Sequence, residues 1–326
     1  MKGFQISRRA VLGGLGAVAL PSAGRAQPGW PDRPVRIIVG FVPGGPSDTI
    51  ARLLAPKLQA AWGQPVIVEN RAGADGVIAT ESVVRSPADG HVLLHAAMNL
   101  LTSAIVHTNV PYDVLRDLTP IYQTASSPTG LLVHPSLPVR TVAELVAYAK
   151  ARPHELSYST SGAGGSGHFA GEIFKAATKT EIEHVAYRGT APALQDLIAG
   201  QVKVSFSTMT TALVMVKEGR ARALAVTSEQ RMAQLPDVPT FTESGYPTLN
   251  ASVWYGLFAP SGTPRPVVDR IADDADTALK TPEFRRFLDE QASLPGGKGP
   301  GPFRQQVERE MTQWRRVAEE TGIRME

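Results

Sequence analysis

The chain has 326 residues and contains no cysteine. This absence excludes disulfide bonds, metal sites built from thiolates and cysteine nucleophiles. Pairs of histidines with carboxylates at the spacing of metal ligands are missing as well, so we expect no metal site. The fold must therefore be stabilised by packing and hydrogen bonds.

A long apolar stretch is also missing, because no segment approaches the roughly 20 consecutive apolar residues of a membrane-spanning helix. The apolar run from Ala10 to Leu20 is too short, and it lies between the basic pair Arg8 and Arg9 and the small residues Ala23 to Ala26. This order of basic, apolar and small segments is typical of a signal peptide. We therefore expect residues 1–26 to direct export to the periplasm, with cleavage near Ala26.

The leader has two further consequences. Ser7-Arg8-Arg9-Ala10-Val11-Leu12 is similar to the twin-arginine signature, and an ordinary secretory signal with two adjacent arginines is the alternative. Cleavage removes four basic residues and no acid, so 33 lysines and arginines become 29 against 30 acids. The mature chain has a net charge of about −1 and gives no indication of nucleic-acid binding.

Glycine and proline, in contrast, are abundant, with 30 and 26 residues in a chain that is 43% hydrophobic. So many turns favour alternating strands and helices, and hence an α/β fold, over a helical bundle. The apolar content exceeds what one domain usually needs, so we expect two lobes.

A strand, a glycine turn and a helix N-terminus follow one another near the start of the mature chain. Residues 35–39 form a β-branched run that predicts a buried strand, and apolar residues at helical spacing extend to Leu58. With Gly45 as the N-cap, Pro46 takes the first helical position and Asp48 the third, where a carboxylate satisfies free amides.

This alternation continues along the chain. Further strands are predicted at 65–70, 92–96, 131–133, 156–159, 182–187, 202–206, 223–226 and 253–258, and helices up to 83, at 142–151, 169–177 and 191–199, and from 266, 282 and 303. The pattern favours mostly parallel sheets with helices on their faces. We place the crossovers near 127 and 250, so 27–127 plus 251–326 form the first lobe and 128–250 the second.

Two loops place glycines between a strand and a helix N-terminus. They are Pro43-Gly44-Gly45-Pro46-Ser47-Asp48 and Ser159 to His168. Glycines let backbone amides approach a ligand, and a helix N-terminus carries partial positive charge, so each loop suits an anion. The alternative is that both loops are only tight turns in an α/β sheet.

The second loop also matches a dinucleotide fingerprint, because Gly162, Gly164 and Gly167 fit G-x-G-x-x-G. A dinucleotide site needs an acid at the end of the next strand, where this chain has Arg188. An exported nicotinamide-dependent oxidoreductase is therefore an alternative, with Arg188 facing a 2′-phosphate. A serine hydrolase is excluded, because His168 stands where G-x-S-x-G requires its last glycine.

Arg188 belongs to a third turn between a strand and a helix, Tyr187 to Pro192. A guanidinium beside free amides is suited to bind a carboxylate with two hydrogen bonds. The turn also lies at the carboxyl end of a predicted strand, where α/β folds usually bind ligands. A solvated surface arginine is the alternative.

Several stretches together resemble the receptors of tripartite tricarboxylate transporters, often called the Bug family. They are Trp30-Pro31-Asp32-Arg33-Pro34-Val35-Arg36, Pro43-Gly44-Gly45 with Asp48, Gly63 to Arg71, Ser86-Pro87-Ala88-Asp89-Gly90, Pro111-Tyr112-Asp113, His184 to Gly189, Gly219 to Thr227 and Leu235 to Thr240. They cover nearly the whole mature chain in the family's order.

The resemblance implies a periplasmic-binding-protein fold of type II with two α/β lobes and a hinge, no cofactor and no catalysis. It also implies a monomer that holds a small carboxylate between its lobes and delivers it to a membrane partner of one large and one small subunit. A sensor that presents the ligand to a signalling receptor is an alternative with the same clamp. The candidate ligand-binding residues are Pro43, Gly44, Gly45, Ser47, Asp48, Asn99, Ser161, Gly162, Ser166, His168, Tyr187, Arg188, Gly189, Thr190 and Ser207.

Three positions depart from the family pattern. Ser207 stands where an acid is frequent, which removes a charge from the expected cleft and argues against a cationic or amino-acid ligand. Val42 replaces a frequent proline or alanine, and Asp75 introduces an acid where glycine is usual. Pocket walls are expected near Met98, Asn99, Met209 and Trp254, and the sequence does not identify the carboxylate.

Overall fold

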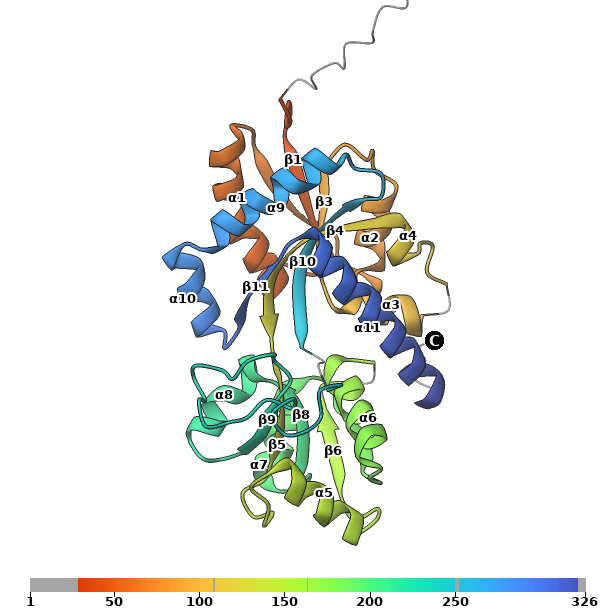
Figure 1. Cartoon of the computed structure of the whole chain (residues 1–326), viewed down its shortest axis with the longest axis vertical. Helices are drawn as coiled ribbons and strands as arrows, with labels where there is room; N and C mark the ends of the chain where they lie inside the picture. The colour runs from red at the N-terminus through yellow and green to blue at the C-terminus, as the bar shows by residue number, and fades with distance from the viewer. Residues whose placement is uncertain (1–28, 108, 163, 250–251, 322–326) are drawn as a thin grey trace, which may run out of the picture. The chain divides into compact units, whose positions relative to one another are not determined.

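The computed structural model describes residues 29–107, 109–162, 164–249 and 252–321. The predicted signal peptide and its cleavage site lie outside the described residues. The chain divides into two compact units, Met1–Trp30 and Pro31–Glu326, and the described helices and strands belong to the second (Figure 1). None of the helices within the described ranges has the length and apolar character of a membrane span.

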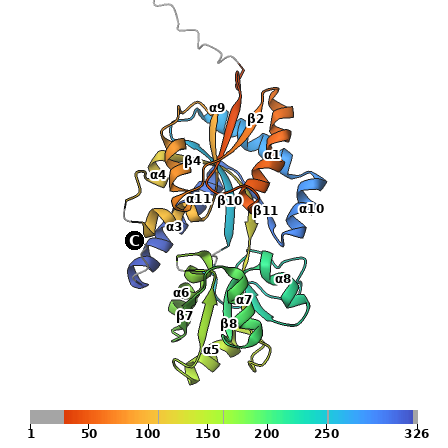
Figure 2. The same cartoon turned by 180° about the vertical axis from the view of Figure 1, so that it is seen from behind.

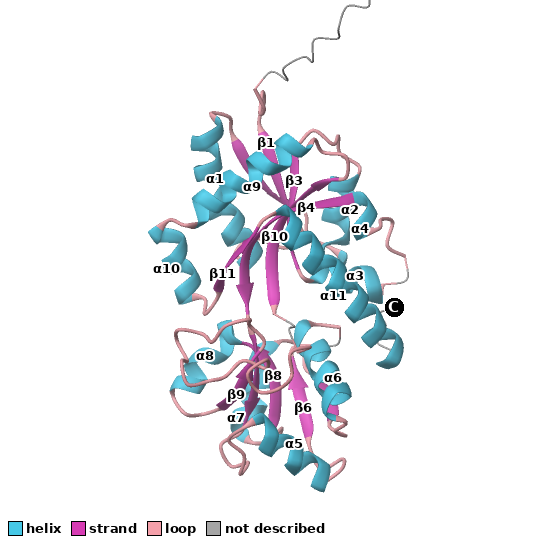
Figure 3. Cartoon of the chain, viewed as in Figure 1, coloured by secondary structure: helices cyan, strands magenta, loops and turns pink. Residues whose placement is uncertain are grey.

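The second unit has two lobes, each built on one sheet (Figure 3). The sheet of the first lobe has six strands in the order β11-β4-β10-β3-β1-β2. Its strands are β1 (Val35–Val39), β2 (Val66–Asn70), β3 (Val92–Ala97), β4 (Leu118–Ser127), β10 (Val253–Pro260) and β11 (Leu294–Lys298). The helical elements of this lobe are α1 (Pro46–Trp62), η1 (Ala74–Gly76), α2 (Val77–Val84), α3 (Asn99–Val106), α4 (Val114–Asp117), α9 (Arg265–Leu279), α10 (Pro282–Glu290) and α11 (Pro300–Thr321).

The sheet of the second lobe has five strands in the order β7-β6-β8-β5-β9. Its strands are β5 (Thr129–Val133), β6 (Ser157–Thr160), β7 (Glu183–Ala186), β8 (Val204–Thr208) and β9 (Arg222–Val226). Its helices are α5 (Val142–Ala151), α6 (Ser166–Thr178), α7 (Thr190–Ala199) and α8 (Met209–Lys217).

Both sheets are mixed, so the expectation of mostly parallel sheets is wrong. In the first sheet β1 pairs in parallel with β2 and β3, whereas β10 runs antiparallel to β3 and β4. The reason lies in the connections between the lobes: β4 carries the chain out of the first lobe and β10 carries it back. Two strands that cross the same boundary in opposite senses pair antiparallel without a crossover helix.

Two connections join the sheets of the two lobes. Only Pro128 separates β4 from β5, and the segment between β9 and β10 returns the chain to the first sheet at Val253. The strands of the first sheet fall within 35–127 and 253–298, and those of the second within 129–226. The lobe boundaries themselves stay a prediction.

Right-handed crossovers position the first helices. Because β3 and β2 lie on either side of β1, the connection through α1 and the connection through α2 run in opposite directions across the sheet. Right-handedness then places α1 and α2 on opposite faces, as Figure 1 shows. The carboxyl ends of β1 and β3 are consequently left free at one edge of the sheet.

Helix α11 contributes to the cores of both lobes. In the first lobe its Phe303 packs edge-on against Trp254 of β10, with ring centroids 5.2 Å apart. Further along, Trp314 contacts Phe169 of α6 in the second lobe, with centroids 4.5 Å apart. Seen from behind in Figure 2, α11 lies beside α3, which it also contacts. The helix therefore bridges the lobes independently of the two strand connections.

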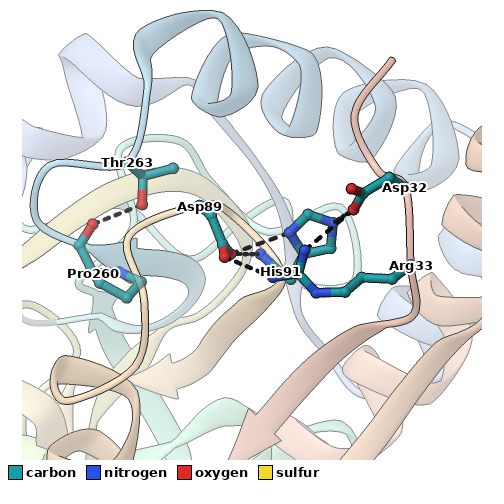
Figure 4. Close-up of polar contacts among 6 residues, drawn as sticks. All are labelled: Asp32, Arg33, Asp89, His91, Pro260 and Thr263. Atoms are coloured by element: carbon teal, nitrogen blue, oxygen red, sulfur yellow. Dashed lines mark hydrogen bonds and ion pairs between the residues drawn. The ribbon is translucent and has the colours of Figure 1, made fainter. Parts of the chain in front are cut away.

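At the amino ends of β1 and β3, a polar network joins two of the stretches that carry the family resemblance. Figure 4 shows His91 between two carboxylates: its Nδ1 lies 3.1 Å from Asp89 and its Nε2 3.1 Å from Asp32. Arg33 contacts both acids, at 2.7 Å from Asp89 and 3.2 Å from Asp32. The loop after β10 lies beside them, where Thr263 donates to the carbonyl of Pro260. These residues fix the strand starts, at the edge opposite the carboxyl ends.

Candidate ligand-binding cavity

A cavity of about 570 Å³ lies between the lobes, at the carboxyl ends of β1, β3 and β6. This is the edge of an α/β sheet where ligands usually bind. The described residues that line it are Phe41, Val42, Gly45, Pro46, Ser47, Asp75, Ala97, Met98, Asn99, Thr102, Ser103, Val106, Ser161, Gly164, Gly165, Ser166, Val253 and Tyr255. Both predicted glycine loops therefore reach one cavity, from opposite lobes.

The first glycine loop is shaped by Gly44, whose φ of +92° is a conformation that other residues rarely adopt. Gly45 is the N-cap of α1 and Pro46 begins the helix, as predicted. Gly45, Pro46 and Ser47 line the cavity, whereas Pro43 and Gly44 are not among its lining residues. The free amides at the start of α1 are thereby directed at the cavity's edge.

Asp48 holds this loop in place through hydrogen bonds. Its buried carboxylate accepts hydrogen bonds from the Gly44 amide at 2.9 Å, from Arg52 Nε at 2.9 and 3.0 Å, and from Asn70 Nδ2 at 2.8 Å. Burial alone would raise the pKa of Asp48, but the donors Arg52, Gly44 and Asn70 outweigh it and hold that pKa below its usual range. Asp48 is thus ionised, and its carboxylate oxygens already accept hydrogen bonds from residues of the protein. It does not line the cavity.

Ser47 lies next to a fully buried histidine. The Ser47 hydroxyl is 2.8 Å from His95 Nδ1, and His95 Nε2 is 3.0 Å from the Thr124 hydroxyl. Burial lowers the pKa of His95 to about 3. A general base must be able to take up a proton near the working pH, so this imidazole is poorly suited to activate the serine. Ser47 therefore contributes a hydrogen-bonding hydroxyl to the cavity lining.

The second glycine loop is tied to the turn beyond β7. The Gly189 amide donates to the Ser161 carbonyl at 3.0 Å, and the Gly162 carbonyl accepts from the Thr160 hydroxyl at 3.0 Å. Gly165 is the N-cap of α6 and Ser166 its first residue. Ser161, Gly165 and Ser166 line the cavity, whereas Gly162 is not among the lining residues.

His168 contacts this loop from within the second lobe. Its Nδ1 accepts a hydrogen bond from the Gly164 amide at 3.1 Å, and its ring stacks on His184 with centroids 3.8 Å apart. His184 Nε2 lies 2.7 Å from the Thr160 hydroxyl. Burial lowers the pKa of both imidazoles, that of His184 to about 4. His168 is buried and is not a lining residue, so it positions the loop through its neighbours.

The third predicted turn and Ser207 are not among the described residues that line the cavity. Tyr187 donates its hydroxyl to Asp196 at 2.7 Å, and Arg188 is exposed. Ser207 is buried with its hydroxyl 2.9 Å from that of Ser205. None of Tyr187, Arg188, Gly189, Thr190 and Ser207 is among the described lining residues. Their roles in binding stay predictions.

The sequence predicts only part of the cavity wall that η1 and α3 form. Asn99 lines the cavity as predicted, and its Nδ2 donates to the Asp75 carbonyl at 2.5 Å. Asp75 lines the cavity too, with its side chain about half exposed. The sequence signal for Asp75 was present, because an acid in a glycine-rich loop departs from the family pattern.

Apolar residues of β10 and α3 complete the wall. Val253 and Tyr255 line the cavity, whereas Trp254 between them is fully buried on the other face of the strand. The alternation of side chains along a strand accounts for this, so the wall expected near Trp254 is formed by its two neighbours. Met209 is likewise buried outside the lining, while Met98 lines the cavity as expected.

A second cavity, of about 510 Å³, is bordered by α6 and α11. The buried Glu310 in its wall accepts hydrogen bonds from Trp254 Nε1 at 2.6 Å and from Gln306 Nε2 at 2.8 Å. Burial raises the pKa of Glu310 to about 7. Lys298 is paired with Glu229 at 2.7 Å. Glu310 and Lys298 thus each have partners within the protein, and no glycine is among the described residues that line this cavity.

The chemistry of the first cavity is therefore that of an anion site without cations. Helix N-termini of α1 and α6 offer backbone amides from both lobes, and Ser47, Ser161 and Ser166 add hydroxyls. No lysine or arginine is among the described lining residues. Within the described ranges, no three histidines or acids are grouped to hold a metal ion.

Comparison with known proteins places this arrangement in a family. The family model described as "Tripartite tricarboxylate transporter family receptor" matches residues 50–323. The chain is 35% identical over 318 residues to Protein BugT of Bordetella pertussis, a match that covers 97% of this chain and 98% of that protein.

Two solved structures have a similar fold. Rpa4515 of R. palustris with adipate is 36% identical, with a TM-score of 0.70 over 90% of this chain and 99% of that one. A TctC solute-binding protein from Polaromonas without ligand is 25% identical, with a TM-score of 0.82 over 89% of this chain and 99% of that one. With the family model matched over most of its length, the chain belongs to the tripartite tricarboxylate transporter family receptors.

Proposed function

We propose that this protein is a periplasmic solute-binding protein that captures a small carboxylate between its two lobes. The observation that carries the proposal is the convergence of two glycine loops, at Gly45 and at Gly165, on one cavity. Each loop begins a helix of more than three turns, whose free amides attract negative charge. Adipate, the ligand in the Rpa4515 structure, is a carboxylate.

Binding proceeds by closure of the lobes around the ligand. The ligand-free Polaromonas protein overlaps this chain better than the adipate complex does, although its sequence is less similar. That order supports an open arrangement in the present structure. Closure would bring the turn at Arg188 toward the ligand, where the guanidinium adds a charge-assisted hydrogen bond.

The captured carboxylate is delivered to a membrane partner with one large and one small subunit, and the protein itself catalyses no reaction. The family is one of transporter receptors, which supports this over the oxidoreductase suggested by Gly162, Gly164 and Gly167. Gly167 has a packing reason of its own, since a Cβ there would stand 2.4 Å from the Phe206 carbonyl oxygen. The leader directs the chain to the periplasm, where it acts as a monomer.

The test is a thermal-shift screen of the mature protein against mono-, di- and tricarboxylates, followed by calorimetry. A ligand at 100 times its Kd stabilises the folded state by about 2.7 kcal/mol, so a true ligand raises Tm clearly. Alcohols and amides of the same carbon skeletons serve as controls and leave Tm unchanged. Absence of a shift with every carboxylate, together with a fluorescence response to nicotinamide cofactors, would establish the oxidoreductase instead.

A further inference from the structure

The cavity is electrostatically polarised, because the helix N-termini of α1 and α6 and the acid Asp75 lie on different elements of its lining. The glycine loops present amides and hydroxyls, whereas the wall of η1 and α3 carries Asp75. Asp75 is the only charged side chain among the described lining residues. A ligand held by its carboxylate at the loops therefore meets a negative charge elsewhere in the same cavity.

The Asp75 carboxylate is largely unengaged. In the part of the chain that the structure describes, its partner is His107, whose Nε2 lies 3.6 Å from Asp75 Oδ2. That separation exceeds hydrogen-bond distance. The side chain is 53% exposed on the cavity wall, so its oxygens remain available to a donor on the ligand.

The backbone of Asp75 is held in place by its neighbours. Its φ of 50° and ψ of 34° lie in the left-handed region, which aspartate adopts more readily than most residues but still at a cost. The carbonyl oxygen of Asp75 accepts hydrogen bonds from Asn99 Nδ2 at 2.5 Å and from the Ser103 hydroxyl at 3.3 Å. Both donors come from α3, so the acid is anchored to a helix of the same wall.

Asn99 adds a second acceptor at this place. While its Nδ2 is used by Asp75, its Oδ1 is buried and accepts no hydrogen bond from a described residue. A buried polar atom without a partner is costly and is usually satisfied by something. The carboxylate of Asp75 and Oδ1 of Asn99 are thus acceptors to which no described residue donates within hydrogen-bond distance.

The cavity lining also contains apolar side chains, among them Met98, Val106 and Val253. A complementary ligand has a carboxylate at one end, an apolar chain, and a hydrogen-bond donor at the other end. A second carboxylate would instead meet the charge of Asp75, and like charges in a partly desolvated site repel. The departure at Ser207 does not oppose a donor, since that side chain is not among the lining residues.

We propose that Asp75, together with Asn99, selects carboxylates whose second polar group is an ammonium or hydroxyl group over those with a second carboxylate. The inference rests on the proposed function. The probes are hexanoate, its ω-amino and ω-hydroxy derivatives and hexanedioate, with the corresponding four-carbon set. Calorimetry at pH 7.5 uses the mature protein, Asp75→Asn, which keeps shape and left-handed backbone, and Asp273→Asn, which removes an exposed charge on α9.

Wild type and Asp273→Asn are expected to bind an ω-amino or ω-hydroxy acid at least tenfold more tightly than the matching dicarboxylate. Asp75→Asn is expected to reduce that ratio at least tenfold, mainly through tighter dicarboxylate binding. An unchanged ratio in Asp75→Asn, a wild-type preference for the dicarboxylate, or binding only of other carboxylates would overturn the selection by Asp75 and leave the proposed function intact. If no carboxylate binds at all, the proposed function fails and the inference falls with it.

Discussion

The rings of His168 and His184 stack with centroids 3.8 Å apart beneath the second glycine loop. The arrangement favours the uncharged form of both rings, because burial lowers the pKa of both imidazoles and His168 Nδ1 accepts a hydrogen bond from the Gly164 amide. Tyr158, Glu172 and Lys175 surround the pair: Tyr158 stacks on His184, and Glu172 accepts from Tyr158 and pairs with Lys175. Burial is the largest effect and lowers the pKa of both imidazoles, while Glu172 raises it and Lys175 lowers it by less than Glu172 raises it.

Stability should consequently fall as pH drops below about 6.5, the ordinary pKa of histidine. Below pH 6.5 the unfolded chain binds a proton at His184, whereas the folded chain does so only near pH 4. The stabilisation that comes from the uncharged His184 is therefore complete above pH 6.5 and is lost as the pH falls through 4. His184→Asn should reduce the slope of unfolding free energy against pH by up to about 1.4 kcal/mol per unit. Urea titrations between pH 7 and 4 measure the slope, and an unchanged slope would show that the stack titrates normally.

A second prediction concerns Ser47. Ser47→Ala removes the hydroxyl that lies 2.8 Å from His95 Nδ1 and leaves a buried nitrogen without a partner. The expected loss of unfolding free energy is about 1–3 kcal/mol, while carboxylate binding weakens only by the loss of one hydroxyl. Thr211→Ala, whose hydroxyl is exposed on α8, is a matched control. Equal stability of the two variants would contradict the structural role of Ser47.

The leader supplies a third prediction, which concerns residues outside those described. Changing Arg8 and Arg9 to lysine preserves the positive charge but removes the arginine pair of the twin-arginine signature. Precursor should then accumulate in the cytoplasm. Fractionation and immunoblotting measure this, and undiminished export would point to the ordinary secretory route.

The features that sequence predicted well are local. The N-cap at Gly45 and the start of α1 at Pro46 follow from three adjacent residues, and β1 from a single β-branched run. The sequence does not predict β4, because Pro120 and the polar residues of this strand interrupt any such run. Strand β11, with Pro295 and two glycines, is a strand only through its pairing with β4. Tertiary pairing decides such segments.

The candidate site likewise combines features that follow from local sequence with features that depend on packing. Its glycine loops follow from strand-turn-helix patterns, but the position of Asp75 beside Asn99 depends on contacts across 24 residues. Asp48 had the right place in the sequence, and only the structure shows that Arg52 and Asn70 already occupy its carboxylate. Spacing predicts which loops approach the ligand, and packing determines which side chains remain available to it.

The last prediction ranks three substitutions by their effect on carboxylate binding. Gly45→Val should be the most damaging, because its side chain would stand where the anion approaches the amides of α1. The protein should stay folded, since the nearest neighbour of a Cβ at Gly45 is the Val42 carbonyl oxygen at 3.9 Å, and the φ of −77° suits any residue. Ser166→Ala should cost about 1 kcal/mol and Arg188→Ala about 1.5 to 3 kcal/mol.

Arg188 tests closure in particular, because it is exposed and outside the described cavity lining. Its substitution weakens binding only if the lobes close and bring the turn to the ligand. Small-angle scattering with saturating ligand should accordingly show a smaller radius of gyration for the wild type. Calorimetry gives the ranking in parallel: unaltered binding by Gly45→Val would make the first loop a structural turn, and unaltered binding by Arg188→Ala with an unchanged radius would show that the site forms without closure.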